Sequence, residues 1–124
     1  PADFASIVLP GGMPGSENLR KSETVISFIR DIHGRGGVVA ALCAAPMVLG
    51  HAGVLEGKKA TCYPGFEGTM KGATSTGAPV EVDGTIITGR GPGCAIPFAL
   101  AVVEALAGKT MMKELRDAMQ VYWM

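Results

Sequence analysis

The segment Val38–Leu42 is a continuous apolar run with no polar residue on either face of a strand. A strand that is apolar on both faces must be buried on both, and such strands belong to parallel sheets that are covered by helices. The run leads almost directly into Ala45–Ala52, whose composition favours a helix that tolerates Pro46 in its first turn. This succession predicts an α/β domain with a mainly parallel sheet.

Short strands and helices alternate along most of the remaining chain. The helix predicted at Glu23–His33 has apolar residues at helical spacing, Ser22 in the N-cap position and glycines after its end. The dipeptide Asp83-Gly84, between two short β-branched runs, is typical of a hairpin. We expect strands at Ser6–Leu9, Lys59–Cys62, Val80–Val82 and Thr85–Thr88, helices at Ala95–Leu106 and Met111–Met119, a loop at Gly11–Leu19 and an ambiguous glycine-rich segment at Pro64–Ala73.

Length and composition restrict the class of protein. The 124 residues suit a single domain that spans positions 1–124. The 11 basic and 11 acidic side chains balance, which argues against a nucleic-acid partner. No apolar stretch approaches the roughly 18 residues of a membrane span, so we expect no membrane partner. The 3 cysteines form an odd, sparse set, which indicates a reducing cytoplasm. The sequence has no CxxC pair and no His-rich tract, which predicts no metal site.

Cys43 stands where the predicted strand Val38–Leu42 gives way to the predicted helix. A nucleophile at such a junction sits on a sharp turn that needs small residues two positions before and after it, and Ala41 and Ala45 meet this need. The turn would present the sulfur at the carboxyl edge of the sheet and at a helix N-terminus, where the pKa of a thiol falls below about 8.5. The pattern predicts a reactive thiol, with a buried structural cysteine as the alternative.

Two glycines, Gly11 and Gly12, follow the predicted strand Ser6–Leu9. Glycines at this place let the backbone approach a ligand closely and turn its N–H groups toward it. Beside Cys43, the N–H groups of Gly12 and Ala44 would form an oxyanion hole. The alternative is an ordinary turn that ends a strand.

Arg90 lies in the Gly/Pro-rich segment Gly89–Gly93, just before a predicted helix. An arginine held in a rigid loop suits the binding of a carboxylate or another anion, with a structural ion pair or a surface position as the alternative. The remaining histidines and cysteines are interpreted as structural. They are His33 and His51 at or near helix ends, and Cys62 and Cys94 as small apolar residues.

Three blocks of the sequence occur in a characteristic order and spacing. They are Val8-Leu9-Pro10-Gly11-Gly12, Ala41-Leu42-Cys43-Ala44-Ala45-Pro46, and Asp83-Gly84 with Thr88-Gly89-Arg90-Gly91-Pro92-Gly93 and the apolar helix that follows. Together they resemble the ThiJ/PfpI superfamily, and most closely the branch with the parkinsonism-associated deglycase and bacterial ThiJ-like proteins. The resemblance covers nearly the whole chain.

The resemblance implies a flavodoxin-like α/β fold, a three-layer sandwich with a mainly parallel sheet, that forms a homodimer. The activities it implies are glyoxalase III-type conversion of 2-oxoaldehydes such as methylglyoxal, removal of early glycation adducts, peroxide sensing and chaperone-like behaviour in the cytoplasm, with no cofactor. The site residues that it implies are Cys43 as an oxidation-sensitive nucleophile, Gly12 and Ala44 as oxyanion-hole donors, and Gly11, Arg90 and Tyr63 in the substrate pocket.

The chain departs from the family pattern at two places. The family's glutamic acid that hydrogen-bonds the nucleophilic sulfur belongs to a first strand–helix unit, whereas this chain begins at Pro1, close to the strand Ser6–Leu9. We therefore expect the first strands and first helix, with that carboxylate, on a separate or cleaved complementing segment, because a bare parallel edge is hard to sustain. Tyr63 takes the place of a pocket histidine of human-like members and is a poor base at pH 7.

Other functions remain open from the sequence. A redox-responsive chaperone or binding protein would use oxidation of Cys43 in place of catalysis. A cysteine peptidase of the PfpI branch has a histidine directly after its nucleophile, where this chain has Ala44. An amidotransferase needs a Cys-His-Glu set, but the only histidine after Cys43 is His51, 8 residues on and in the same predicted helix. A phosphate- or flavin-binding module rests on analogy of fold alone.

Overall fold

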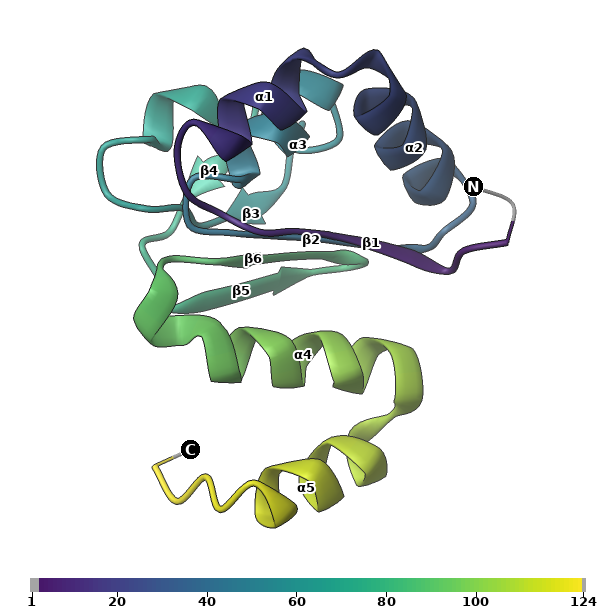
Figure 1. Cartoon of the computed structure of the whole chain (residues 1–124), viewed down its shortest axis with the longest axis vertical. Coiled ribbons are helices and arrows are strands. Elements are labelled where there is room, and N and C mark those ends of the chain that lie inside the picture. The colour runs from purple at the N-terminus through teal and green to yellow at the C-terminus, as the bar shows by residue number, and fades with distance from the viewer. Residues whose placement is uncertain (1–2, 124) are drawn as a thin grey trace.

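The computed structural model describes residues 3–123 and places a sheet at the centre of the molecule (Figure 1). Four strands form this sheet: β1 (Ser6–Leu9), β2 (Val38–Leu42), β5 (Val80–Asp83) and β6 (Ile86–Gly89). Their order across the sheet is β1-β2-β6-β5. Two further short strands, β3 (Lys59–Ala60) and β4 (Thr74–Ser75), pair with each other.

Helices lie on both faces of the central sheet (Figure 1). One face carries α1 (Gly15–Lys21), α2 (Glu23–Gly34) and α3 (Pro46–Ala52), and the other carries α4 (Ala95–Ala107), on which α5 (Lys109–Ala118) packs. The elements also include the 3-10 turns η1 (Glu67–Thr69) and η2 (Pro92–Cys94). Within residues 3–123, no helix has both the length and the apolar character needed to cross a bilayer.

The sheet is mainly parallel, as the sequence predicts. β1 pairs with β2, and β2 pairs with β6, in parallel register, whereas β5 and β6 form an antiparallel hairpin. Helices on both faces of a mainly parallel sheet give the three layers of a flavodoxin-like α/β fold. Because β1, β2 and β6 run in the same direction, their carboxyl ends meet at one edge of the sheet, where open α/β folds bind their ligands.

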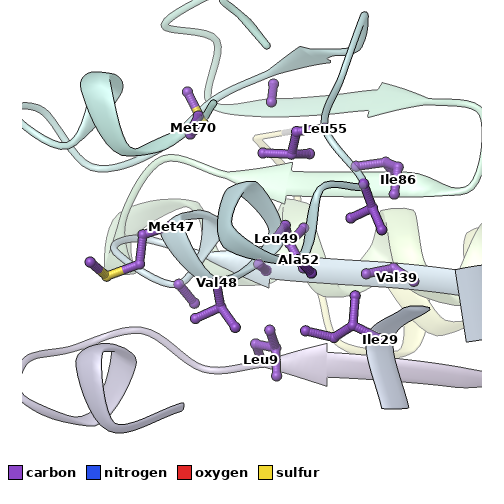
Figure 2. Packing of buried hydrophobic residues seen from close by; sticks show 14 of the residues in the cluster. Leu9, Ile29, Val39, Met47, Val48, Leu49, Ala52, Leu55, Met70 and Ile86 are labelled. Carbon is purple, nitrogen blue, oxygen red and sulfur yellow. The ribbon is translucent and has the colours of Figure 1, made fainter. Parts of the chain in front are cut away.

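β2 separates two clusters of buried apolar side chains. Val39 and Ala41 belong to the larger cluster beneath α2 and α3, and Ala40 belongs to the smaller cluster beneath α4. Figure 2 shows Ile29 from α2 and Leu49 from α3 packed around Val39 in the larger cluster. Ile29 and Leu49 are fully buried, and burial of side chains of this size contributes about 1.5–3 kcal/mol each.

Two segments differ from the expectation. Most of α1 lies in the segment Gly11–Leu19, which the sequence predicts to be a loop. The sequence does not reveal this helix, because it has no side-chain cap and turns mainly Leu19 and the buried Ser16 inward, so it lacks an apolar period. The strand predicted at Lys59–Cys62 ends at Ala60. The N–H of Thr61 donates to the side-chain hydroxyl of Thr88 instead of to the carbonyl oxygen of a neighbouring strand.

β1 is less buried than its composition predicts. The side chain of Val8 is 46% exposed, because α4 packs on β2, β6 and β5 beside it. Among the described residues, no strand pairs with the outer edge of β1. The sheet therefore has an open parallel edge next to the exposed side chain of Val8.

Candidate active site

Cys43 occupies the sharp turn between β2 and α3. Its φ of +64° lies in the left-handed region, which costs a non-glycine residue about 1–2 kcal/mol. Two hydrogen bonds hold the turn: the N–H of Cys43 donates to the carbonyl oxygen of Gly89 at 2.9 Å, and its own carbonyl oxygen accepts from the N–H of Tyr63 at 2.8 Å. The backbone therefore has the strained strand–turn–helix form of a nucleophile elbow.

Gly11 brings the loop after β1 against this turn. A β-carbon built on Gly11 would lie 2.5 Å from the Cβ of Cys43 and 2.7 Å from the carbonyl oxygen of Leu42. Real β-carbons do not approach other atoms this closely, so only glycine fits here without a shift of the backbone. The next residue, Gly12, has a φ of +93°, a conformation that also favours glycine.

Arg90 reaches the same edge of the sheet directly after β6. Its guanidinium Nη1 donates to the carbonyl oxygen of Cys62 at 3.3 Å, which ties the arginine to the segment that leads to Tyr63. A β-carbon built on Gly91 would lie 3.5 Å from the ring of Tyr63, so the ring rests against the loop that carries Arg90. The N–H of Tyr63 donates to the carbonyl oxygen of Cys43, and the N–H of Cys43 donates to that of Gly89, the residue before Arg90. The side chains of Tyr63 and Arg90 therefore both begin beside the elbow.

Two backbone N–H groups near the elbow, those of Ala44 and Gly12, have no partner among the described residues. Ala44 is only 2% exposed, and no acceptor within residues 3–123 takes a hydrogen bond from its N–H. The N–H of Gly12 is likewise unpaired in the described part of the chain. A buried N–H without a partner is uncommon in proteins, so the N–H of Ala44 marks a place where an acceptor atom from outside the chain could bind.

The side chain of Cys43 is half-buried, and no carboxylate or imidazole of residues 3–123 hydrogen-bonds its sulfur. The two histidines lie elsewhere. His33 is in the last turn of α2, and His51 is in the last turn of α3, at the end of this helix that is remote from Cys43. The described residues therefore place a thiol, unpaired amides and an arginine at one edge of the sheet, and none of their carboxylates or imidazoles hydrogen-bonds the thiol.

The other cysteines occupy different environments. Cys62 is fully buried, and this burial raises the pKa of its thiol to about 11. Cys94, in η2, is partly exposed rather than packed as a small apolar residue. Within residues 3–123, no group of three or more His, Cys, Asp or Glu residues is arranged to hold a metal ion.

We expect iodoacetamide at pH 8 to label Cys43 and to leave Cys62 unlabelled. A thiol with a pKa of about 11 is only about 0.1% ionised at pH 8, and Cys62 is also inaccessible. Labelling of Cys62 should increase as the pH is raised toward 11, because the reactive thiolate then forms. Peptide mass spectrometry after partial labelling measures both sites, and equal labelling at pH 8 would contradict the assignment of Cys62 as buried.

Glu67 is a charged residue of this region to which the sequence pattern assigns no role. Its carboxylate accepts the N–H of Gly65 at 2.8 Å. Hydrogen bonds from its own backbone N–H and from that of Gly65 hold the pKa of the Glu67 carboxyl below its ordinary value, and the charge of Arg90 lowers it further. No sequence signal could reveal this, because the segment 64–73 has neither helical nor strand periodicity.

Comparison with known proteins adds to this geometry. The model of the DJ-1/PfpI family matches residues 1–105 of the chain. Protein DJ-1 homolog B of Arabidopsis thaliana is 43% identical over 114 residues, and the match covers 90% of this chain and 26% of the relative. Deglycase PH1704 of Pyrococcus horikoshii is 39% identical over 94 residues, which cover 74% of this chain and 56% of the relative.

The same likeness holds in three dimensions. The crystal structure of Drosophila melanogaster DJ-1beta superposes with a TM-score of 0.88 at 39% sequence identity, and the match covers 97% of this chain and 66% of that one. This chain thus spans between about a quarter and two thirds of the length of these relatives.

Proposed function

Because the chain belongs to the DJ-1/PfpI family, we propose that it is a cysteine-dependent enzyme of glyoxalase III or deglycase type, which acts on 2-oxoaldehydes such as methylglyoxal or on early glycation adducts. One relative, from Pyrococcus horikoshii, bears the name deglycase. The observation that carries the proposal is the left-handed turn at Cys43 beside the buried, unpaired N–H of Ala44.

In the proposed reaction, the thiolate of Cys43 adds to the aldehyde carbon of methylglyoxal and forms a hemithioacetal. The N–H groups of Gly12 and Ala44 donate hydrogen bonds to the oxygen that becomes negative. The proton on the former aldehyde carbon moves to the neighbouring carbonyl carbon, and the proton of the hemithioacetal hydroxyl moves to the oxygen of that carbonyl. This gives a thioester, which water hydrolyses to lactate and the free thiol. The sum is methylglyoxal plus water to lactate, so the reaction requires no cofactor and no external oxidant.

Arg90, Tyr63 and Gly11 surround the proposed position of the substrate. The guanidinium of Arg90 donates to the second carbonyl oxygen of the substrate and to the carboxylate of the product. The hydroxyl of Tyr63 donates a hydrogen bond but does not act as a base near pH 7. Gly11 lets the loop after β1 pack closely on the elbow, where a β-carbon would collide with Cys43.

The proton shift requires a base, and we propose that a complementing segment supplies it as a carboxylate, as the family pattern implies. The open edge of β1 and the exposed side chain of Val8 offer the place for a further strand and helix. Intact-mass analysis of the native protein should find sequence beyond these residues, joined to them or tightly associated. A single species with the mass of this chain alone would contradict the proposal.

We also propose that the protein is a homodimer in the cytoplasm. α4 and α5 expose several large apolar side chains, among them Ile96, Met111 and Leu115, and a second copy of the chain would bury them. Light scattering of the intact protein should give twice the mass of one protomer, and a monomer at micromolar concentration would contradict the dimer.

The direct test of the function is to incubate the intact protein with methylglyoxal and to measure both loss of the aldehyde and formation of lactate. We expect lactate to form in amounts equal to the aldehyde consumed, and pre-treatment with iodoacetamide to stop its formation. Loss of aldehyde without lactate would contradict the enzyme, because lysine and arginine side chains consume aldehyde without catalysis.

A redox-responsive chaperone or binding protein is the second candidate, favoured by the accessibility of Cys43 relative to the buried Cys62. Hydrogen peroxide would oxidise the Cys43 thiolate to a sulfenate and then a sulfinate, each step transferring one oxygen and releasing water. We expect mild peroxide to add two oxygens to Cys43 before Cys94 or Cys62 changes, as measured by peptide mass spectrometry. Equal oxidation of all three would remove this candidate.

Peptidase and amidotransferase activities are less favoured. A peptidase of the PfpI branch would need a histidine at the position of Ala44. An amidotransferase would need an imidazole at the thiol, whereas His51 lies at the far end of α3 from Cys43.

A further inference from the structure

A surface depression lined by basic side chains lies on the face of the sheet that carries α1, α2 and α3, and we name it the basic hollow. Two adjoining depressions of about 540 and 370 Å³ form it and share Arg20 and His51 as common lining. Lys21 and Arg30 line the first depression and Lys71 the second. Four separate segments thus converge: the end of α1, the middle of α2, the end of α3 and the loop after η1. Figure 1 shows the three helices gathered on this side of the sheet.

Two acidic side chains, Glu17 and Glu23, also line the basic hollow, but they do not balance its positive charge. Glu17 accepts two hydrogen bonds from the Nε of Arg20, at 3.0 and 3.1 Å, and this pairing holds the pKa of the Glu17 carboxyl below its ordinary value. Glu23 is the other carboxylate of the lining. Four permanent cations therefore face two carboxylates, which leaves an excess of two positive charges with His51 neutral.

Three of the cations have no carboxylate partner among the described residues. They are Lys21, Arg30 and Lys71. Like charges that gather without counter-charges repel one another, within a screening length of about 8 Å at physiological salt. A bound anion would remove this repulsion.

Arg30 is the best placed of these groups for binding. Its Nε donates to the carbonyl oxygen of Ala52 at 2.9 Å, which orients the guanidinium and leaves its terminal N–H groups for another acceptor. Ser27, one turn earlier on the same helix, lines the same depression and adds a hydroxyl donor. A planar pair of N–H donors matches the oxygens of a phosphate group.

The simplest competing explanation concerns the helix dipole. Arg20 and Lys21 lie in the last turn of α1, where basic side chains stabilise a helix. This accounts for neither Arg30, which is in the interior of α2, nor Lys71, which is in no helix. The helix dipole therefore does not explain why Arg30 and Lys71 line the same hollow as Arg20 and Lys21.

We propose that the basic hollow binds the phosphomonoester group of a small soluble molecule. The group is largely dianionic near pH 7.5 because its second pKa is about 6, and its charge matches the excess of the lining. The combined depressions have the size of ordinary ligand sites. This inference is independent of the proposed function, because neither depression is lined by Cys43, Ala44 or Arg90.

The test is a titration of the intact polypeptide with 3-phosphoglycerate and with inorganic phosphate, followed by calorimetry and by amide chemical shifts. We expect saturable binding with shifts at residues 20, 30 and 51. Arg30→Gln and Lys71→Gln should each weaken binding about tenfold, as loss of a charge-assisted contact does. Lys71→Gln keeps the test decisive if Arg30→Gln disturbs the end of α3, because Lys71 has no described partner in the fold.

The matched control is Arg116→Gln, which removes one positive charge from α5 on the opposite face of the sheet. Binding should be unchanged in this variant. Equal weakening in Arg116→Gln and Lys71→Gln would overturn the site, because it would indicate general charge attraction. Binding to phosphatidylcholine vesicles that contain phosphatidic acid, without binding of 3-phosphoglycerate, would overturn the assignment to a soluble ligand.

Discussion

Replacing Cys43 by alanine is expected to abolish lactate formation from methylglyoxal, with less than about 0.1% of the activity left, because no other group can form the covalent intermediate. Alanine keeps the β-carbon and meets the same left-handed strain at φ +64°, so the turn itself should persist. Cys43→Ser should be nearly as inactive, since a hydroxyl at neutral pH is a far weaker nucleophile than a thiolate. The measurement is the initial rate of lactate formation at saturating methylglyoxal.

The matched control is Cys94→Ala, which removes a partly exposed thiol from η2 and should keep nearly full activity. Thermal unfolding should place all three variants close to the parent protein, which separates loss of chemistry from loss of fold. Retained turnover in Cys43→Ala would refute the enzymatic assignment. Full loss in Cys94→Ala would shift the reactive site away from the elbow.

Gly11→Ala is expected to cost about 1–3 kcal/mol of stability, the usual cost of overpacking. The added methyl would lie 2.5 Å from the Cβ of Cys43 and 2.7 Å from a backbone oxygen, so either the loop after β1 or the elbow must move. A displacement of about 1 Å at a reacting group can cost about 100-fold in rate, so we expect activity to fall by that factor. Chemical denaturation and the methylglyoxal assay measure the two effects.

Gly15→Ala provides the comparison, because a β-carbon built there meets no atom within 4 Å. This variant carries the same change at the start of α1 and should keep both stability and activity. If Gly11→Ala were as stable and active as Gly15→Ala, the close packing of the β1 loop on the elbow would be wrong.

The sequence allowed the strands of the sheet to be predicted wherever burial acts on both faces. β2 is apolar throughout because α2 and α3 cover one face and α4 the other, and such a strand is recognisable without its neighbours. The hairpin at Asp83-Gly84 and the N-cap at Ser22 are equally local, and Ser22 indeed accepts a hydrogen bond from the N–H of Val25. Local signals of this kind need no knowledge of the tertiary fold.

The features that depend on distant contacts could not be predicted. α1 lacks an apolar period, and its place comes from packing against α2 and α3. The anchoring of Arg90 by the carbonyl of Cys62 joins residues 28 positions apart, and the hydrogen bonds of Glu67 depend on an irregular turn. At the candidate site, residue identity indicated Cys43 and the glycines, but the unpaired N–H of Ala44 became visible only with the backbone in place.

The open outer edge of β1 bears on how the protein behaves when it is made. A row of unpaired backbone groups beside the exposed Val8 is a template on which another extended chain can add itself. We expect copies of the chain whose β1 edge stays unpaired to recruit one another, so that the soluble yield falls as expression rises.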